Sequence, residues 1–229
     1  MNAAADVVFV TSEVLRKKAQ PYVRGLLRYY PNVADYDHFV RARSTDEQSP
    51  VEITRFSQPR IGFVGAISGY KVDFNLIAKA AALRPDWSWV LIGQVGEGDP
   101  HTDVTSLDHS NIHLLGPKPY EELPGYLKAM DVAVLPCALN EYTRSMFPMK
   151  FFEYLAAGKV VIATDLPSLE PHKDIFVLAR TAEEFVDRIA GVLSGQIGFT
   201  PEMDRAAKEN TWELRLNRML SDIQAAQGD

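Results

Sequence analysis

The sequence contains a single cysteine, Cys137, among 229 residues, so an internal disulfide is excluded, and a lone thiol suits a reducing cytoplasm. It has no run of 18 apolar residues, which is the pattern of a transmembrane helix. The first residues, Met-Asn-Ala-Ala-Ala-Asp, lack the basic start of a signal peptide, so we expect no secretory leader. Positive charge is also scarce, because 24 basic and 30 acidic side chains give a net charge of −6. This balance argues against a general nucleic-acid-binding protein.

The sequence has no repeat and no low-complexity tract; instead, short runs rich in Val, Ile and Leu alternate with stretches of helical periodicity. Strands are predicted at residues 6–11, 61–65, 88–92, 112–115, 132–135, 159–164 and 175–178. Helices are predicted at residues 13–27, 73–83, 120–130, 148–157, 182–194 and 201–225. This alternation favours an α/β fold with a Rossmann-like, doubly wound parallel sheet, preceded by an N-terminal β-α-β extension. Residues 41–59 are charged and polar, and we interpret them as a mobile linker.

A glycine-containing turn follows the predicted strand 61–65. Gly65, Ser68 and Gly69 allow the backbone to come close to a phosphate, and Lys71 adds a positive charge. The turn matches neither a full G-x-G-x-x-G motif nor a Walker A motif, so a tight turn with a surface lysine is an equal alternative.

Lys150 and Glu153 lie three residues apart at the start of the predicted helix 148–157, on neighbouring positions of one face. Lys150 can reach a diphosphate bound at the helix start, and Glu153 can accept hydrogen bonds from a ribose diol. The alternative is an ordinary surface ion pair, which the spacing favours.

For the other reactive side chains, structural roles explain the sequence better than catalytic or metal-binding roles. The group His101, Asp103, Asp108 and His109 lies in a polar loop without metal-ligand spacing, so no metal is expected. Cys137 is interpreted as a small buried residue, because nothing near it in sequence would activate a thiolate. Asp131 precedes a strand and is expected to accept hydrogen bonds from backbone N–H groups.

Several stretches resemble the nucleotide-sugar-binding half of GT-B glycosyltransferases. The resemblance is closest to the retaining group 1, family 4-type enzymes that build bacterial surface polysaccharides. It is carried by residues 62–67 (GFVGAI), 84–93 (RPDWSWVLIG), 111–124 (NIHLLGPKPYEELP), 131–136 (DVAVLP) and 147–161 (FPMKFFEYLAAGKVV). Residues 1–40 resemble the end of the other GT-B domain, so the resemblance implies a 1–40 segment, a 41–59 linker and a 60–229 nucleotide-sugar-binding domain.

The resemblance implies a donor site with named roles. Glu153 matches the second glutamate of the family's E-x7-E pattern and is expected on the donor ribose, while Lys150 is the candidate for stabilising the phosphate charge. The backbone from Phe147 to Met149 and the turn after Gly65 would face the diphosphate, and the loop 116–119 would lie against the base. The implied substrate-binding residues are Gly65, Ala66, Lys71, Gly93, Lys118, Pro119, Ser145, Phe147, Pro148, Met149, Lys150 and Glu153.

The sequence departs from the family pattern at two positions. Ser145 stands where the first glutamate is common, although a subgroup with Pro-x-Lys-x-x-Glu-Tyr also lacks it, and Asn32-Val33 replaces the usual Asn-Gly. Donor binding is therefore better supported than catalysis by the standard arrangement. The alternatives are a non-catalytic nucleotide-binding or assembly module, and an enzyme like the nucleotide-sugar 2-epimerases.

The resemblance also implies partners. The donor would be a UDP-, GDP- or dTDP-sugar, and no cofactor is expected. The acceptor domain is missing from this chain, so the chain alone is expected to be inactive as a hexosyltransferase. Residues 1–40 or the last helix are candidates for a homodimer contact. The expected location is the cytoplasm, with the missing domain able to bring the enzyme to the inner membrane face.

Overall fold

A computed structural model describes residues 5–227. Residues 1–4, which belong to the expected 1–40 segment and to the start that lacks a signal-peptide pattern, lie outside the described residues. The main body is a six-stranded parallel sheet in the order β5-β4-β3-β6-β7-β8. Its strands are β3 (Arg60–Val64), β4 (Ser88–Ile92), β5 (Ile112–Leu114), β6 (Val132–Leu135), β7 (Val161–Ala163) and β8 (Val177–Leu178). From β3 the chain moves outward through β4 to β5 and then returns to the other side of β3 at β6. The predicted doubly wound, Rossmann-like sheet is thus confirmed.

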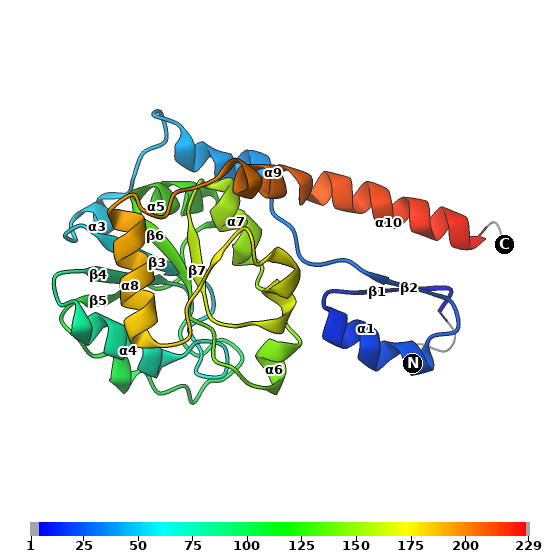
Figure 1. Cartoon of the computed structure of the whole chain (residues 1–229), viewed down its shortest axis with the longest axis horizontal. Coiled ribbons are helices and arrows are strands. Elements are labelled where there is room, and N and C mark those ends of the chain that lie inside the picture. The colour runs from blue at the N-terminus through cyan, green and yellow to red at the C-terminus, as the bar shows by residue number, and fades with distance from the viewer. Residues whose placement is uncertain (1–4, 228–229) are drawn as a thin grey trace.

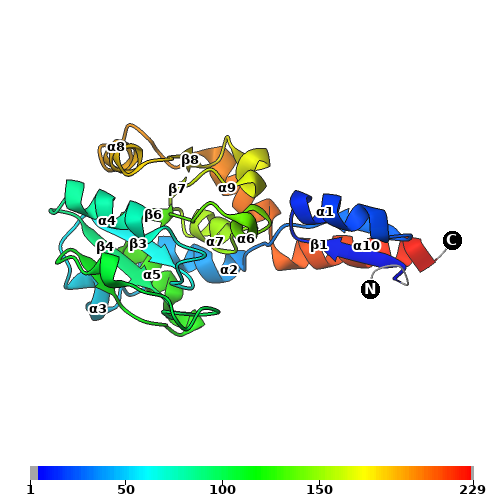
Figure 2. The ribbon, with the colours of Figure 1, turned by 90° about the horizontal axis from the view of Figure 1, so that it is seen from below.

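Helices cover both faces of this sheet (Figure 2). One face carries α4 (Phe74–Leu83) and α8 (Ala182–Leu193), and the other carries α2 (Tyr36–Phe39), α3 (Val51–Thr54), α5 (Leu123–Ala129), α7 (Lys150–Ala156) and α9 (Pro201–Glu209). Successive strand side chains point to opposite faces, so Val132 and Val134 pack with α4 and α8 while Ala133 and Leu135 pack with α7. Both faces are buried, which explains the continuous apolar runs of the strands.

Residues 41–59 are packed onto the domain and do not form the mobile linker that their polarity suggested. Ile53 of α3 is fully buried in the core. Glu52 accepts hydrogen bonds from Lys118 Nζ (2.9 Å) and from the Tyr126 hydroxyl (2.7 Å). The ammonium of Lys128 donates to three backbone carbonyls of this segment, the shortest bond being 2.7 Å to Ser44 O. Long-range side-chain contacts fix the segment, and local composition does not reveal them.

The N-terminal segment forms its own small lobe with β1 (Val7–Val10), α1 (Glu13–Ala19) and β2 (Leu26–Tyr29), and β1 pairs in parallel with β2. The helix predicted over 13–27 is therefore wrong beyond residue 19. Pro21 lies in a short 3-10 turn, and Gly25 passes so close to β1 that a Cβ there would lie 2.1 Å from Asp6 O. A continuing helix would not allow this approach, and the parallel pairing replaces it.

The last predicted helix is two helices, α9 and α10 (Trp212–Gln227), because the chain breaks at Asn210 and Thr211. The Asn210 side chain donates to Ala206 O at the end of α9, and the Thr211 hydroxyl caps the Leu214 N–H. Past this break, α10 runs away from the main sheet and lies beside β1 and β2 (Figure 1). Over residues 5–227, no helix combines the length and apolar character that a membrane crossing requires.

Tyr154 ties α7 to the end of β3 just before the Gly65 turn. Its hydroxyl accepts a hydrogen bond from Val64 N–H at 2.7 Å and donates to Val64 O at 3.2 Å. Tyr154→Phe should lower the free energy of unfolding by about 1–3 kcal/mol, because it leaves a buried N–H unsatisfied. Urea unfolding measures the loss, and Tyr22→Phe is the near-neutral control, because Tyr22 is 69% exposed. Equal stabilities of the two variants would show that Val64 finds another partner.

Candidate donor site

A cavity of about 520 Å³ opens at the carboxyl ends of the strands, where the strand order reverses between β3 and β6. A ligand site is expected at this position of a doubly wound sheet, and the volume lies within the range of small-molecule sites. Nine of the twelve sequence-predicted residues line it, namely Gly65, Ala66, Lys71, Gly93, Lys118, Phe147, Pro148, Met149 and Lys150. The remaining three, Pro119, Ser145 and Glu153, are not among the lining residues.

Two glycines bring the strand ends into close contact beneath the cavity. Gly65 N–H donates to Ile92 O at 2.9 Å, and Gly93 N–H donates to Gly116 O at 3.0 Å. Gly93 has φ +150°, and a Cβ there would lie 1.8 Å from Gly65 O. The position therefore requires glycine, since any side chain would push the β3 and β4 loops apart.

The positive charge of the lining residues comes from three lysines, and each is paired with a carboxylate. The ammonium nitrogens lie 3.7 Å (Lys71 with Glu97), 2.7 Å (Lys118 with Glu52) and 2.7 Å (Lys150 with Glu153) from the nearest carboxylate oxygen. These cations line one cavity: Lys71 and Lys118 come from the loops after β3 and β5, and Lys150 is the first residue of α7. Such an arrangement can bind an extended anion such as a diphosphate.

The pair of Lys150 and Glu153 is not an ordinary surface ion pair. Glu153 is only 5% exposed, whereas Lys150 itself lines the cavity. Burial raises the pKa of the Glu153 carboxyl above its ordinary value, although the ammonium of Lys150 opposes this shift. Glu153 thus lies behind Lys150 and holds the cation at the cavity wall.

The start of α7 forms one wall of the cavity through Phe147, Pro148 and Met149. Asn32, far away in sequence, donates from its side-chain amide to Phe147 O at 2.9 Å and lines the cavity itself. Phe147 is 1% exposed and stacks on Phe152 at a ring-centroid distance of 5.6 Å. The wall is therefore fixed both by aromatic packing and by the segment that precedes α2.

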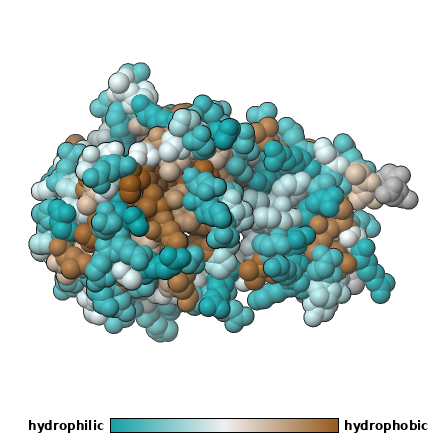
Figure 3. All heavy atoms as spheres, in the orientation of Figure 1, coloured by the Kyte–Doolittle hydropathy of each residue, from teal (hydrophilic) through white to brown (hydrophobic). Residues whose placement is uncertain are grey.

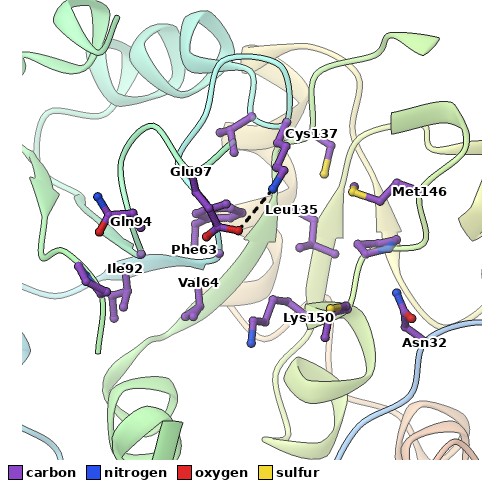
Figure 4. Close-up of a pocket in the computed structure, with 18 of the residues that line it drawn as sticks. Asn32, Phe63, Val64, Ile92, Gln94, Glu97, Leu135, Cys137, Met146 and Lys150 are labelled. Atoms are coloured by element: carbon purple, nitrogen blue, oxygen red, sulfur yellow. Dashed lines mark ion pairs between the residues drawn. The ribbon is translucent and has the colours of Figure 1, made fainter. Parts of the chain in front are cut away.

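Sequence reasoning missed several lining residues, including Asn32, Gln94, Glu97, Tyr142 and Met146. Figure 4 shows Glu97 directed into the cavity and joined to Lys71 by an ion pair, with Asn32 and Lys150 on the side of α7. A local signal existed for Glu97 alone, since it stands between Gly96 and Gly98 in a loop directly after a buried strand. The others are brought to the cavity by tertiary contacts.

Cys137 and Asp131, for which the sequence predicted structural and not chemical roles, have those roles in the structure. Cys137 lines the cavity but is buried, and burial raises the pKa of its thiol to about 12, which excludes a thiolate nucleophile at neutral pH. Asp131 accepts from Arg60 N–H at 2.7 Å and from the Gln58 amide at 3.1 Å, so it is satisfied structurally. Within residues 5–227, no group of three His, Cys, Asp or Glu side chains could hold a metal ion.

Similarity to known proteins identifies the family of this chain. The family model described as "Glycosyl transferases group 1" matches residues 58–195. The chain is 31% identical over 169 residues to the putative teichuronic acid biosynthesis glycosyltransferase TuaH of Bacillus subtilis (strain 168), covering 72% of this chain and 41% of that protein. The chain thus spans less than half the length of this relative.

Solved structures show the same fold at lower sequence identity. Sucrose-phosphate synthase from Thermosynechococcus elongatus has a TM-score of 0.72 at 19% identity, and the match covers 100% of this chain and 60% of that one. Anabaena HepE, solved in complex with UDP-glucose, has a TM-score of 0.74 at 18% identity and covers 98% and 65%. The sequence-based assignment is confirmed by the family model: the chain belongs to the group 1 glycosyltransferases.

Proposed function

We propose that this chain binds the nucleotide-sugar donor of a retaining glycosyltransferase, which transfers the sugar to a glycan or lipid-linked acceptor. The observation that carries the proposal is the ring of Lys71, Lys118 and Lys150 around one cavity at the strand reversal. A nucleoside diphosphate sugar offers two phosphate charges in an extended shape, and this distribution of cations suits it.

The two ends of the cavity suit different parts of such a donor. The diphosphate lies between the Gly65 turn, Lys71 and Lys150, where close backbone approach and positive charge coincide. The base lies toward Lys118, which Glu52 holds at 2.7 Å. Glu153 supports the α7 wall of the site from behind, because its carboxylate holds the Lys150 ammonium at 2.7 Å.

The same cations serve the chemical step. Transfer breaks the bond between the sugar C1 and the oxygen of the β-phosphate, and negative charge develops on the departing diphosphate. Lys150 and Lys71 lie where they stabilise that charge, and the packed wall of α7 keeps Lys150 in place.

The acceptor site belongs to a part of the enzyme outside this chain, and the chain alone transfers sugar poorly or not at all. Support comes from the coverage of TuaH, of which this chain matches 41%. Support also comes from α10, which lies beside the N-terminal lobe and exposes apolar side chains at Trp212 (54%), Leu216 (56%) and Leu220 (46%). Hydrophobic surface is visible on this lobe (Figure 3), as expected of a face that another domain covers.

Calorimetric titration with UDP-, GDP- and dTDP-sugars tests the proposal. We expect saturable binding of one base series, and the UDP series comes first because HepE is solved in complex with UDP-glucose. The folded state of the chain is checked by a cooperative unfolding transition. A folded chain that binds none of the three series would overturn the proposal.

A non-catalytic nucleotide-binding module is the second candidate, and the position of Ser145 favours it. Ser145 ends the short helix α6 (Glu141–Arg144) and is not among the lining residues. The two functions differ in product: a full-length enzyme that binds donor but yields no glycosylated acceptor with any tested glycan or lipid-linked sugar would support the module.

A further inference from the structure

We propose that Glu97 binds the hydroxyl groups of the donor sugar and sets which sugar the site accepts. The inference rests on the proposed function, and it assigns the sugar end of the cavity to a loop that the sequence motifs do not include. Among the residues that line the cavity, Glu97 carries the only carboxylate. Its side chain is 59% exposed, so a ligand can reach it.

Glu97 lies beside Lys71, a lysine that faces the diphosphate in the proposed donor site, so the sugar that follows the diphosphate is within its reach. Glu97 lies 3.7 Å from Lys71, and Lys71 O accepts a 3.0 Å hydrogen bond from Ala138 N–H in the loop after β6. The pair therefore lies where the loop after β4 meets the turn after β3, and Lys71 also contacts the loop after β6, whereas Lys118 lies on the β5 side with the expected base. A donor that places its diphosphate beside Lys150 and Lys71 presents its sugar to Glu97.

The backbone at Glu97 is held firmly although the side chain is exposed. The hydroxyl of Ser68, a fully buried residue, donates to Glu97 O at 2.6 Å, and Gly96 N–H donates to Ile67 O at 2.9 Å. Gly98 packs so closely on Tyr70 that a Cβ there would lie 2.5 Å from the Tyr70 hydroxyl. These contacts join the loop after β4 to the turn after β3, so the backbone that carries the carboxylate is held in place before any ligand arrives.

The chemistry of a carboxylate suits sugar hydroxyls. An ionised carboxylate only accepts hydrogen bonds, and a sugar offers several hydroxyl donors around its ring. Lys71 beside it neutralises the repulsion that a bare carboxylate would exert on the diphosphate. Hydrogen bonds to charged groups are strong enough that losing one weakens binding by about tenfold or more.

A competing role for Glu97 makes a different prediction. If its carboxylate only occupies Lys71 until a phosphate displaces it, then removing the charge tightens binding of the nucleoside diphosphate and of the nucleotide sugar by the same factor. If Glu97 binds the sugar, then only the nucleotide sugar loses affinity relative to the diphosphate. The ratio of the two dissociation constants separates these roles.

The experiment titrates the full chain with the nucleoside diphosphate and with the nucleotide sugar of the base that the wild type binds. We expect Glu97→Ala to raise the ratio Kd(nucleotide sugar)/Kd(diphosphate) about tenfold, and Glu97→Gln to raise it less, because the amide keeps one acceptor oxygen. Glu209→Gln, an exposed residue on α9, is the matched control and should leave the ratio unchanged.

Each outcome decides the question. A ratio within twofold of wild type for Glu97→Ala overturns the sugar role, whether both affinities tighten together or neither changes. Retained diphosphate binding shows that the variant is folded, so a changed ratio is not a folding effect. If the folded wild type binds neither ligand of any base, the proposed function itself fails, and this result is distinct from an unchanged ratio.

Discussion

Replacing Lys150 by methionine should weaken binding of the nucleotide sugar by about 10- to 100-fold, because a charge-assisted contact to a phosphate contributes about 1.5–3 kcal/mol. Lys150 is well placed for this contact, since it lines the cavity and its ammonium is fixed 2.7 Å from Glu153. Methionine keeps most of the length and the apolar character of the lysine stem and removes the charge and its donors. Calorimetric titration of the variant and wild type measures the effect.

The design must separate lost binding from lost folding, because Lys150→Met leaves the buried Glu153 without its cation. The double variant Lys150→Met, Glu153→Gln removes both charges and should unfold near the wild-type urea midpoint while still binding donor weakly. Lys79→Met, an exposed lysine on α4, is the matched control and should bind donor normally. A donor affinity within twofold of wild type in the double variant would exclude Lys150 from the phosphate site.

Much of the main sheet could be predicted because its determinants are local. Runs such as Val132–Leu135 have both faces buried, so they appear in the sequence as short continuous apolar segments. The boundaries that failed depend on contacts far along the chain. Leu26 joins β2 because its N–H donates to Asp6 O at 2.7 Å, and the break before α10 is held by Ala34 N–H donating to Asn210 O at 3.1 Å. The spacing of apolar residues along the sequence does not reveal such distant hydrogen-bond partners.

The residues of the candidate site also fall into those that local sequence could identify and those that depend on distant contacts. Gly65 and Gly93 follow strands directly, so the rule that ligands bind at strand ends was enough to select them. Asn32 could not be selected, because its amide meets Phe147 O across 115 positions of sequence. Glu153 was selected for its spacing from Lys150, but spacing does not reveal depth, and the structure places it behind the cation and not in the lining.

The glycine at the meeting point of the β3 and β4 loops should have the largest effect on stability. Gly93→Ala is expected to lower the free energy of unfolding by about 3 kcal/mol or more, since it combines overpacking with an unfavourable φ. The clash is with the backbone carbonyl of Gly65 at 1.8 Å, which cannot rotate away as a side chain would. Moving that carbonyl also strains the 2.9 Å bond from Gly65 N–H to Ile92 O. Urea or thermal unfolding measures the loss.

Gly198→Ala is the matched control for this variant, because a Cβ at Gly198 meets nothing within 4 Å. It should be neutral or stabilising by up to about 1 kcal/mol, since alanine restricts the unfolded chain. The contrast isolates the close approach of the two loops from the general effect of adding a methyl group. If Gly93→Ala lost less than about 1 kcal/mol, the β3 and β4 loops would be able to separate at little cost. The bound donor would then hold the β3 and β4 loops together at the base of the cavity, and part of the free energy of donor binding would be needed to bring the loops into contact.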